Sequence, residues 1–247
     1  MSVLTELRDG VMTLTLNRPE AGNSLNPEVG AGLVAAMDEA NSNPDVRVLI
    51  ITGAGEKIFC AGMDLKAFAA GENMALVGAG LAKLTTCVKP VIAAVNGMAL
   101  AGGFEVMMKC DLVVAADHAK FGIPEVKRGL VAAGGGTRLP KRIPLQVALE
   151  LGLTGEPMTA ARALELGLVN RVVPAADVMS TALALAALIT ANGPLAVQAT
   201  KRLMWDEVGD DPLEHIGRTV APVFASEDAR EGATAFAQKR QPEWKGR

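Results

Sequence analysis

Apolar and polar residues alternate in two different periods along the first half of the chain. From Val11 to Leu16 apolar residues alternate with threonines, which is the period of a strand with one buried face. Val48 to Thr52 and Val91 to Val95 are continuous apolar runs, as expected for strands covered on both faces. Between the first two strands, Asn26 provides an N-cap for a helix predicted from Pro27 to about Asn41. Strands and helices that follow one another in this way predict an α/β fold.

The same alternation continues and then ends near residue 173. We expect a helix from Gly103 to Lys109, a strand from Leu112 to Ala115, helices at Pro144 to Leu151 and Thr159 to Leu166, and a strand from Val169 to Val173. Only helices are predicted afterwards: Ala175 to Asn192, Leu195 to Glu207, Pro212 to Phe224, and Glu227 to Lys239 behind a Ser226 cap. The break at Asn192-Gly193-Pro194 divides a core, residues 1–192, from a helical region, residues 193–247.

Composition narrows the class of protein. The chain has 247 residues, half of them hydrophobic, which is enough for one substantial core. Its formal charge of −3, with acids and bases interspersed, gives no footprint for nucleic acid or an anionic membrane. Three cysteines without metal-ligand spacing fit a reducing compartment. The N-terminus lacks a leader pattern and the apolar run 182–189 is too short to span a bilayer, so we expect a cytoplasmic protein.

Chemistry based on histidine, cysteine or tyrosine is disfavoured. His118 and His215 are the only histidines, and neither lies in a nucleophile or metal pattern, so no metal is expected. We expect Cys60 to be a small buried hydrophobe, and the chain has no tyrosine.

Two carboxylates follow turns of small residues. Residues 96–105, NGMALAGGFE, come directly after a buried strand and open a helix, whose first N–H groups have no internal partner and can face an oxygen of a ligand. A glycine pair alone is more often explained by close packing of a helix on a sheet, and Glu105 alone could pair with Lys109 for only about 0.3 to 0.5 kcal/mol. Glu125 ends a second such segment, FGIPE. Carboxyl groups beside N–H donors can move protons next to a carbonyl, which favours an enzyme that forms an enolate.

Several motifs in order carry a family resemblance. They are FCAGMDL at 59–65, KPVIAAVNG at 89–97, the Cys110-Asp111 pair, FGIPE at 121–125, GGGTRL at 134–139, TG at 154–155, AARA at 160–163, GLV at 167–169 and PEWKGR at 242–247. Together they closely resemble the enoyl-CoA hydratase/isomerase family, the crotonases, over nearly the whole chain.

The resemblance implies a fold, an assembly and a substrate. The expected fold is a spiral of repeated strand-strand-helix units followed by a helical region that forms homotrimers or dimers of trimers. The expected substrate is an acyl-CoA thioester whose carbonyl oxygen accepts hydrogen bonds from the backbone N–H groups of Met63 and Gly102. No separate cofactor is expected, because coenzyme A is part of the substrate.

The family's hydratases use two glutamates, and both matching positions, Glu105 and Glu125, are glutamate here. We assign Glu105 to the water and Glu125 to the α-proton, although two close carboxyls can share these roles. The resemblance also implies substrate contacts at Ala21, Ala61, Asp64, Leu65, Phe236 and Lys239, the last two from a neighbouring subunit. Asp64 is better explained as a helix cap than as a catalyst.

We therefore expect hydration of a trans-2-enoyl-CoA thioester, or the reverse dehydration, and two alternatives stay open. An isomerase needs one proton shuttle, which leaves Glu105 redundant. A protein that only binds acyl-CoA would have lost a glutamate. Dehalogenase and naphthoate-synthase variants lose support, because Ala132-Ala133-Gly134 offers no third carboxylate.

Overall fold

The computed structural model describes residues 1–208 and 224–243. Two stretches lie outside the described part of the chain, residues 209–223 and 244–247. The first contains His215 and all of the helix predicted from Pro212 to Phe224 except Phe224 itself.

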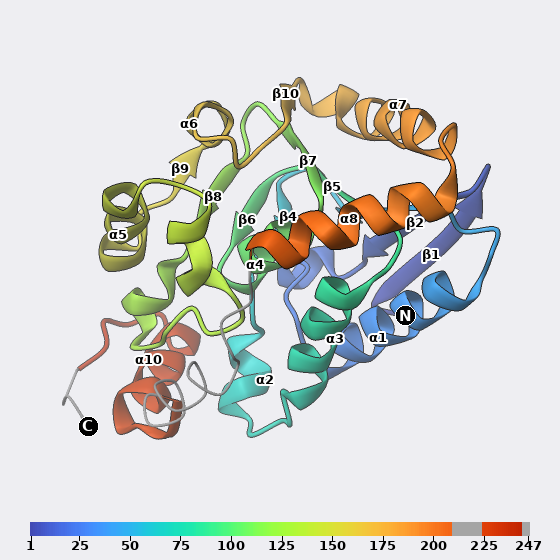
Figure 1. Ribbon diagram of the computed structural model, residues 1–247. Helices are drawn as coiled ribbons and strands as arrows, with labels where there is room; N and C mark the ends of the chain where they lie inside the picture. Colours follow the sequence, from blue (N-terminus) through green and yellow to red (C-terminus); the bar gives the residue numbers. More distant parts are fainter. Residues whose placement is uncertain (209–223, 244–247) are drawn as a thin grey trace.

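Two sheets form the centre of the molecule (Figure 1). The larger has the order β1 (Val3–Arg8), β2 (Val11–Leu16), β3 (Val48–Gly53), β5 (Val91–Val95), β7 (Leu112–Ala116) and β10 (Arg171–Val173). The smaller has the order β4 (Ile58–Cys60), β6 (Met98–Leu100), β8 (Lys120–Gly122) and β9 (Met158–Thr159). The strands β3 and β5 are wholly buried, as their continuous apolar sequences predict.

The chain winds as a spiral in which each turn gives one strand to each sheet. Strands β3, β5 and β7 pair in parallel in the large sheet, while β4, β6 and β8 pair in parallel in the small one. Loops at equivalent places in successive turns therefore lie next to one another, although tens of residues separate them in sequence. This architecture confirms the predicted crotonase-like α/β fold.

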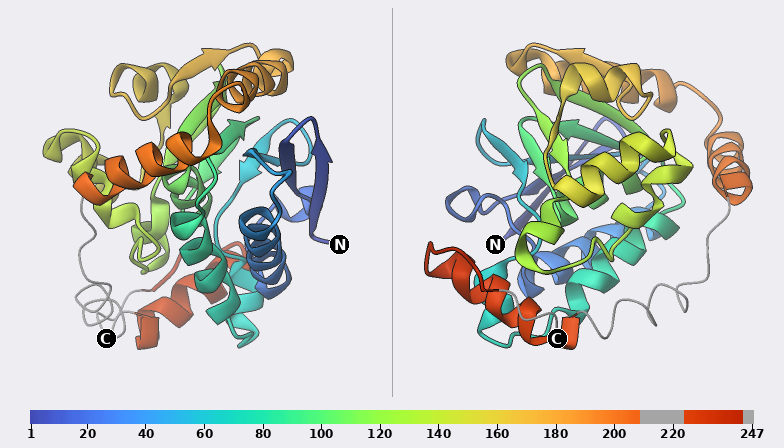
Figure 2. Two further views of the ribbon diagram at one scale, coloured as in Figure 1. Left: turned by 45° about the vertical axis from the view of Figure 1, so that its right-hand side comes forward. Right: turned by 90° about the vertical axis from the view of Figure 1, so that its left-hand side faces the viewer.

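Helices surround the sheets (Figure 2). They are α1 (Pro27–Ser42), α2 (Leu65–Ala69), α3 (Ala75–Thr86), α4 (Gly102–Lys109), α5 (Leu145–Thr154), α6 (Ala160–Glu165), α7 (Val178–Thr190), α8 (Pro194–Val208) and α10 (Glu227–Ala237), with short 3-10 helices η1 (Pro19–Ala21), η2 (Pro124–Arg128), η3 (Gly136–Lys141) and η4 (Ala175–Asp177). The predicted caps at Asn26 and Ser226 are confirmed, because the Asn26 side chain accepts from the Val29 N–H and the Ser226 side chain from the Ala229 N–H. The helices α2 and α3 were not predicted.

The two C-terminal helices meet the core in different ways. Helix α10 packs against α2 and η2, whereas α8 stands at the outer edge of the molecule in the right-hand view of Figure 2. Among the described residues no single helix is long and apolar enough to cross a membrane. Only when two segments bent by 109° against each other, Ala175–Thr190 and Pro194–Trp205, are counted together do their length and composition reach that of a membrane span. The division at residue 192 and the assembly of the helical region remain predictions.

Candidate active site

Two turns from successive layers of the small sheet bring the Met63 and Gly102 N–H groups together. Met63 lies in the turn between β4 and α2, and Gly102 is the first residue of α4 after β6. A Cβ built on Gly102 would lie 3.6 Å from the Met63 nitrogen, and one built on Gly62 would lie 2.9 Å from the Gly102 nitrogen. The two backbone nitrogens are thus close neighbours, as the pairing of β4 with β6 requires.

Both N–H groups are available to a ligand. Leu25 forms a parallel bridge with Met63 in which the Leu25 N–H donates to the Gly62 carbonyl (2.7 Å) and the Asp64 N–H donates to the Leu25 carbonyl (2.9 Å). Both bonds belong to the neighbours of Met63, so its own N–H points away from Leu25. The Gly102 N–H is at a helix start, where no intrahelical partner exists. Within the described part of the chain, neither group donates a backbone hydrogen bond.

The backbone at these turns is unusual. Gly62 has φ +94°, and a Cβ there would lie 2.6 Å from that of Ala101, so only glycine fits. Ala101 itself has φ 51° and ψ −127°, a conformation that costs a residue with a side chain about 1 to 3 kcal/mol. Its N–H donates to the Gly122 carbonyl of β8 at 2.9 Å, which helps to hold the turn. Strain of this kind is concentrated where a structure orients groups for function.

Glu105 lies one turn into α4 and is 4 % exposed. Its Oε1 accepts a hydrogen bond from the Gly136 N–H at 2.8 Å. A Cβ on Gly134 would lie 2.2 Å from Oε2, so the carboxylate rests directly against the glycine-rich loop 134–136. Burial raises the pKa of Glu105, while the N–H groups of this loop and the charge of Lys109 act in the opposite direction. The sequence offered the three glycines as a signal, but their role as a cradle for Glu105 was not predicted.

Glu125 lies in η2, three residues after β8. Its Oε2 is buried and, within the described residues, has no hydrogen-bond partner. Burial first, and then the negative charge of Glu105, raise the pKa of Glu125 to about 8. The two carboxyls are therefore close enough to influence each other, and Glu125 carries a proton at neutral pH.

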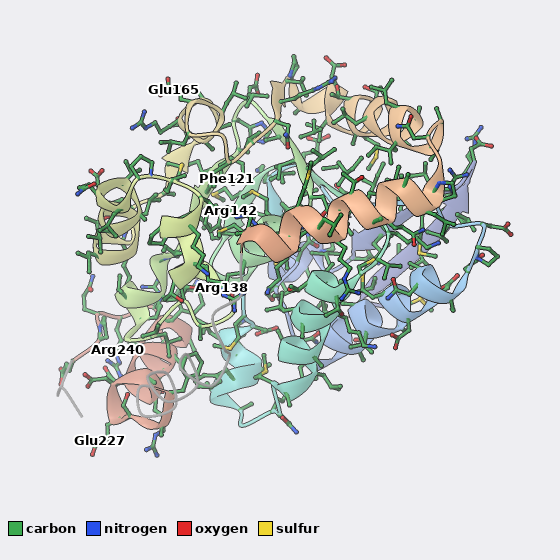
Figure 3. All side chains as sticks on the ribbon, in the orientation of Figure 1. Phe121, Arg138, Arg142, Glu165, Glu227 and Arg240 are labelled. Atoms are coloured by element: carbon green, nitrogen blue, oxygen red, sulfur yellow. The ribbon has the colours of Figure 1, made fainter. Side chains whose placement is uncertain are left out.

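A cavity of about 50 Å³ lies beside Glu105. Its lining includes Met108 on α4, Trp205 and Val208 on α8, and the cationic side chains of Lys109, Arg138, Lys141 and Arg142. Figure 3 shows Arg142, which also lines this cavity, beside the C-terminal end of α8.

Asp64 is a helix cap, as the sequence predicts. Its Oδ1 accepts from the N–H groups of Lys66 and Ala67, and its Oδ2 pairs with the Arg18 guanidinium at 2.9 Å. Burial works against ionisation, but the Ala67 N–H and Arg18 hold the pKa of Asp64 below its usual range. Arg18 also donates to the Ser24 carbonyl at 2.8 Å, so it ties loop 18–24 to the turn that carries Met63. This role of Arg18 was not recognised from the sequence.

The remaining predicted contact residues fall into two places. Ala61 donates its N–H to Gly22 beside Ala21, and Leu65 opens α2, so these three residues lie near the Met63 turn. Phe236 and Lys239 instead line a second, open cavity of about 550 Å³ with Lys127 and Arg128. The Arg128 guanidinium lies 4.9 Å from the Phe236 ring centroid, and Arg128 is on the same short helix as Glu125.

Other reactive side chains lie outside this arrangement. Cys60 is buried, and burial raises the pKa of its thiol to about 12, which removes it as a nucleophile at neutral pH. His118 is at the surface, with Nε2 3.2 Å from the Glu56 carbonyl oxygen. The described residues contain no group of three or more His, Cys, Asp or Glu side chains placed to hold a metal ion.

Glu105, Glu125 and the two unbonded N–H groups form a candidate active site, and comparisons with known proteins identify the family. The family model for enoyl-CoA hydratase/isomerase matches residues 6–247. The chain is 42 % identical over 253 residues to a carnitinyl-CoA dehydratase of Proteus mirabilis, covering 97 % of each sequence. Two solved structures match the whole chain, and each match includes 99 % of the solved chain. They are a carnitinyl-CoA hydratase from Mycobacterium avium (47 % identity, TM-score 0.91) and an enoyl-CoA hydratase from Mycobacterium tuberculosis (51 % identity, TM-score 0.80).

The chain therefore belongs to the enoyl-CoA hydratase/isomerase family. Its named relatives are hydratases and dehydratases, which supports a lyase of hydratase type.

Proposed function

We propose that this protein adds water to a trans-2-enoyl-CoA thioester to form the 3-hydroxyacyl-CoA, or catalyses the reverse dehydration. The observation that carries the proposal is a pair of glutamates beside two free N–H groups: Glu105 is buried and bonded by a glycine loop, and half-buried Glu125 has a buried oxygen without a partner among the described residues. In this proposal the N–H groups of Met63 and Gly102 hold the thioester carbonyl oxygen and stabilise the enolate as its charge develops.

The environments of the two carboxyls assign their roles. Burial raises the pKa of Glu105, but the glycine loop and Lys109 favour its charged form, which supports a role as the base that takes a proton from water. Glu125 is protonated at neutral pH because its pKa is about 8, so it acts as the acid that supplies the α-proton. The proposal therefore needs the two carboxyl groups in different protonation states at the same pH.

The proposed cycle conserves atoms and charge. Glu105 takes one proton from water while the water oxygen bonds to the β-carbon, and the electron pair of the double bond moves to the thioester oxygen as an enolate. The enolate then collapses, and the α-carbon takes the proton of Glu125. The cycle closes when the proton on Glu105 returns to Glu125, directly or through solvent.

An isomerase is the second candidate, because an α-proton shuttle at Glu125 alone could move a double bond. It leaves the bonded and buried carboxylate of Glu105 without a task, so we prefer the hydratase. The M. avium and P. mirabilis relatives are named for carnitinyl-CoA, but nothing in the described site is specific for that acyl group. A trimeric or hexameric assembly and a cytoplasmic location remain part of the proposal.

The source of the product's oxygen tests the proposal. Crotonyl-CoA and longer trans-2-enoyl-CoA thioesters are incubated with the protein in oxygen-18 water that also contains deuterium, and the products are analysed by mass spectrometry. We expect heavy oxygen at the β-carbon and deuterium at the α-carbon. A rearranged enoyl product without heavy oxygen would identify an isomerase, and binding without any product would identify a binding protein.

A further inference from the structure

Leu25 lies beside both of the N–H groups that face the site. Its backbone bridges Met63, because the Leu25 N–H donates to the Gly62 carbonyl at 2.7 Å and the Asp64 N–H donates to the Leu25 carbonyl at 2.9 Å. Its side chain is buried, and its Cδ1 would lie 3.1 Å from a Cβ built on Gly102. The direction of the Met63 N–H therefore depends on where the backbone of Leu25 is held.

Arg18 holds the loop in which Leu25 lies. Its Nη1 donates to the Ser24 carbonyl at 2.8 Å and to the Ser24 hydroxyl at 3.2 Å. Its backbone N–H donates to Oδ1 of Asn23 at 3.0 Å, and Nδ2 of Asn23 donates to the Ile58 carbonyl at 2.8 Å. Asn23 and Ser24 are both buried, so water does not readily replace these contacts. They fix the two residues that precede Leu25.

The same guanidinium also reaches the other side of the turn. Its Nη2 pairs with Oδ2 of Asp64 at 2.9 Å, and the side chains of Arg18 and Asp64 are only 18 % and 12 % exposed. Oδ1 of Asp64 accepts from the N–H groups of Lys66 and Ala67, so this carboxylate also fixes the start of α2. A guanidinium is planar and holds its N–H groups in a fixed fork. One arginine thus sets the spacing between Ser24 and Asp64, which flank the bridge on either side.

This spacing matters for the chemistry of the site. A backbone donor stabilises an enolate only when it points to the place that the oxygen occupies in the transition state. Loss of one such donor reduces kcat by about 10² to 10³-fold, and a displacement of about 1 Å can cost on the order of 10²-fold. The side chain of Met63 does not aim its own N–H, so the aim depends on what holds the backbone on either side.

We infer that Arg18 is a positioning residue of the active site, which acts through Ser24 and Asp64 to hold the Met63 N–H in the direction that stabilises the enolate. It needs no contact with the substrate for this role. The inference rests on the proposed function, because it takes the thioester oxygen to lie at the N–H groups of Met63 and Gly102. Lysine at position 18 would keep the charge, but its single nitrogen cannot hold both partners in the fixed geometry of a guanidinium.

The carbonyl stretching band of a bound thioester tests the inference, because stronger hydrogen bonds to the oxygen move this band to lower wavenumber. Butyryl-CoA with and without carbon-13 at the carbonyl is bound to the wild type, Arg18→Lys, Asp64→Asn and the double variant, and infrared difference spectra are recorded. Asp64→Asn keeps an oxygen that can cap α2 but loses the charge that pairs with Arg18. The matched control is Arg162→Lys, the same substitution in an exposed pair with Glu165.

We expect the band to lie below that of free butyryl-CoA in the wild type and in Arg162→Lys, and to move back toward the free value in Arg18→Lys. On crotonyl-CoA, kcat of Arg18→Lys should fall by about 10 to 10²-fold with a smaller change in KM, because the lost interaction is strongest in the transition state. Exchange of α-protons should fall with hydration, since both reactions pass through the enolate. Asp64→Asn should behave like Arg18→Lys, and the double variant should be little worse than either.

Circular dichroism and the melting temperature establish that each variant is folded, and Asp64→Asn serves if Arg18→Lys does not fold. An unmoved band in both single variants overturns the inference, even if their kcat falls. A higher KM with unchanged kcat overturns it as well, since Arg18 would then only support binding.

The same samples separate this inference from the proposed function. A lowered band in the wild type that moves back in Arg18→Lys, without hydration of any enoyl thioester, supports the positioning role and refutes the proposed function. Hydration by the wild type that Arg18→Lys and Asp64→Asn leave unchanged refutes the positioning role alone. Failure of the wild type to bind butyryl-CoA or crotonyl-CoA overturns both.

Discussion

The surroundings of Glu105 and Glu125 differ in hydrogen bonding rather than in residue type. Glu105 lies on α4 against loop 134–136 and is almost fully buried. It accepts a hydrogen bond from the Gly136 N–H at 2.8 Å. Glu125 lies on η2 with one buried oxygen that has no partner among the described residues. Burial raises the pKa of both, but three N–H groups and a lysine oppose the effect at Glu105, whereas a single backbone N–H, its own, opposes it at Glu125. Backbone donors and a nearby cation can thus favour the charged form of one of two neighbouring carboxyls and leave the other protonated.

The largest expected effect is on turnover when either carboxyl is removed. Glu105→Gln and Glu125→Gln should each reduce the rate on the best enoyl thioester by about 10² to 10⁴-fold, because each loses one proton-transfer group and keeps its shape. Glu165→Gln, at the surface on α6 and labelled in Figure 3, is the matched control and should be unaffected.

The two variants should also differ from each other. Exchange of the α-protons of a saturated acyl-CoA in deuterated water should persist in Glu105→Gln and disappear in Glu125→Gln, as nuclear magnetic resonance can detect. Near-normal turnover of enoyl thioesters in Glu105→Gln would contradict the assignment and favour an isomerase.

A smaller loss of turnover should follow when only the glycine loop 134–136, which contacts Glu105, is changed. In Gly134→Ala the new Cβ would lie 2.2 Å from Glu105 Oε2, so the carboxylate must move. A displacement of about 1 Å can reduce a rate on the order of 10²-fold, and we expect this loss in hydration while α-proton exchange at Glu125 continues. Gly78→Ala on α3, where no atom lies within 4 Å of the new Cβ, is the control. Equal loss of hydration and exchange would show that the substitution disturbs the whole site.

The pH dependence should follow Glu125. Since hydration needs its protonated form and its pKa is about 8, kcat/KM should fall about tenfold per pH unit well above pH 8. Exchange of α-protons needs the ionised form, so its rate should rise up to about pH 8. In Glu105→Gln the negative charge next to Glu125 is gone, so the pKa of Glu125 should fall. The pH at which the α-proton exchange rate reaches half its maximum should therefore move to a lower value. An unmoved midpoint would mean that the two carboxyls do not interact.

A separate effect is expected on stability. The pKa of Glu125 is raised from 4.5 to about 8 on folding, so below 4.5 both folded and unfolded states are protonated. Between 4.5 and 8 only the unfolded state ionises, and the free energy of unfolding falls by roughly 1.4 kcal/mol per pH unit from this group. Glu125→Gln should therefore be more stable than the wild type at pH 7 to 8 and equal to it near pH 4. Urea unfolding at both pH values measures this, and a lower stability of the variant at pH 8 would contradict it.

Elements with a strong local pattern were predictable, and elements held by tertiary contacts were not. The wholly buried strands β3 and β5 match their apolar runs, and helix α1 begins at its predicted cap. Strand β1 was missed because five of its six residues are exposed, although Asp9 and Gly10 offered a turn signal before β2. Helix α3 was missed because Gly78 and Gly80 weaken its propensity, and packing against α1 overrides that weakness.

The sequence by itself determined the fold class, the two small-residue turns and the identity of the two carboxyls, because these depend on local periodicity and on residue type. Only the tertiary structure decided that the Gly136 N–H donates to Glu105, that Arg18 pairs with Asp64, and that the Trp205 indole donates to Asp111. These partners lie 31, 46 and 94 positions apart, and they meet because the parallel spiral and α8 place their loops side by side. Local patterns carry no information about such distances, so the protonation states of the two carboxyls depend on the folded chain.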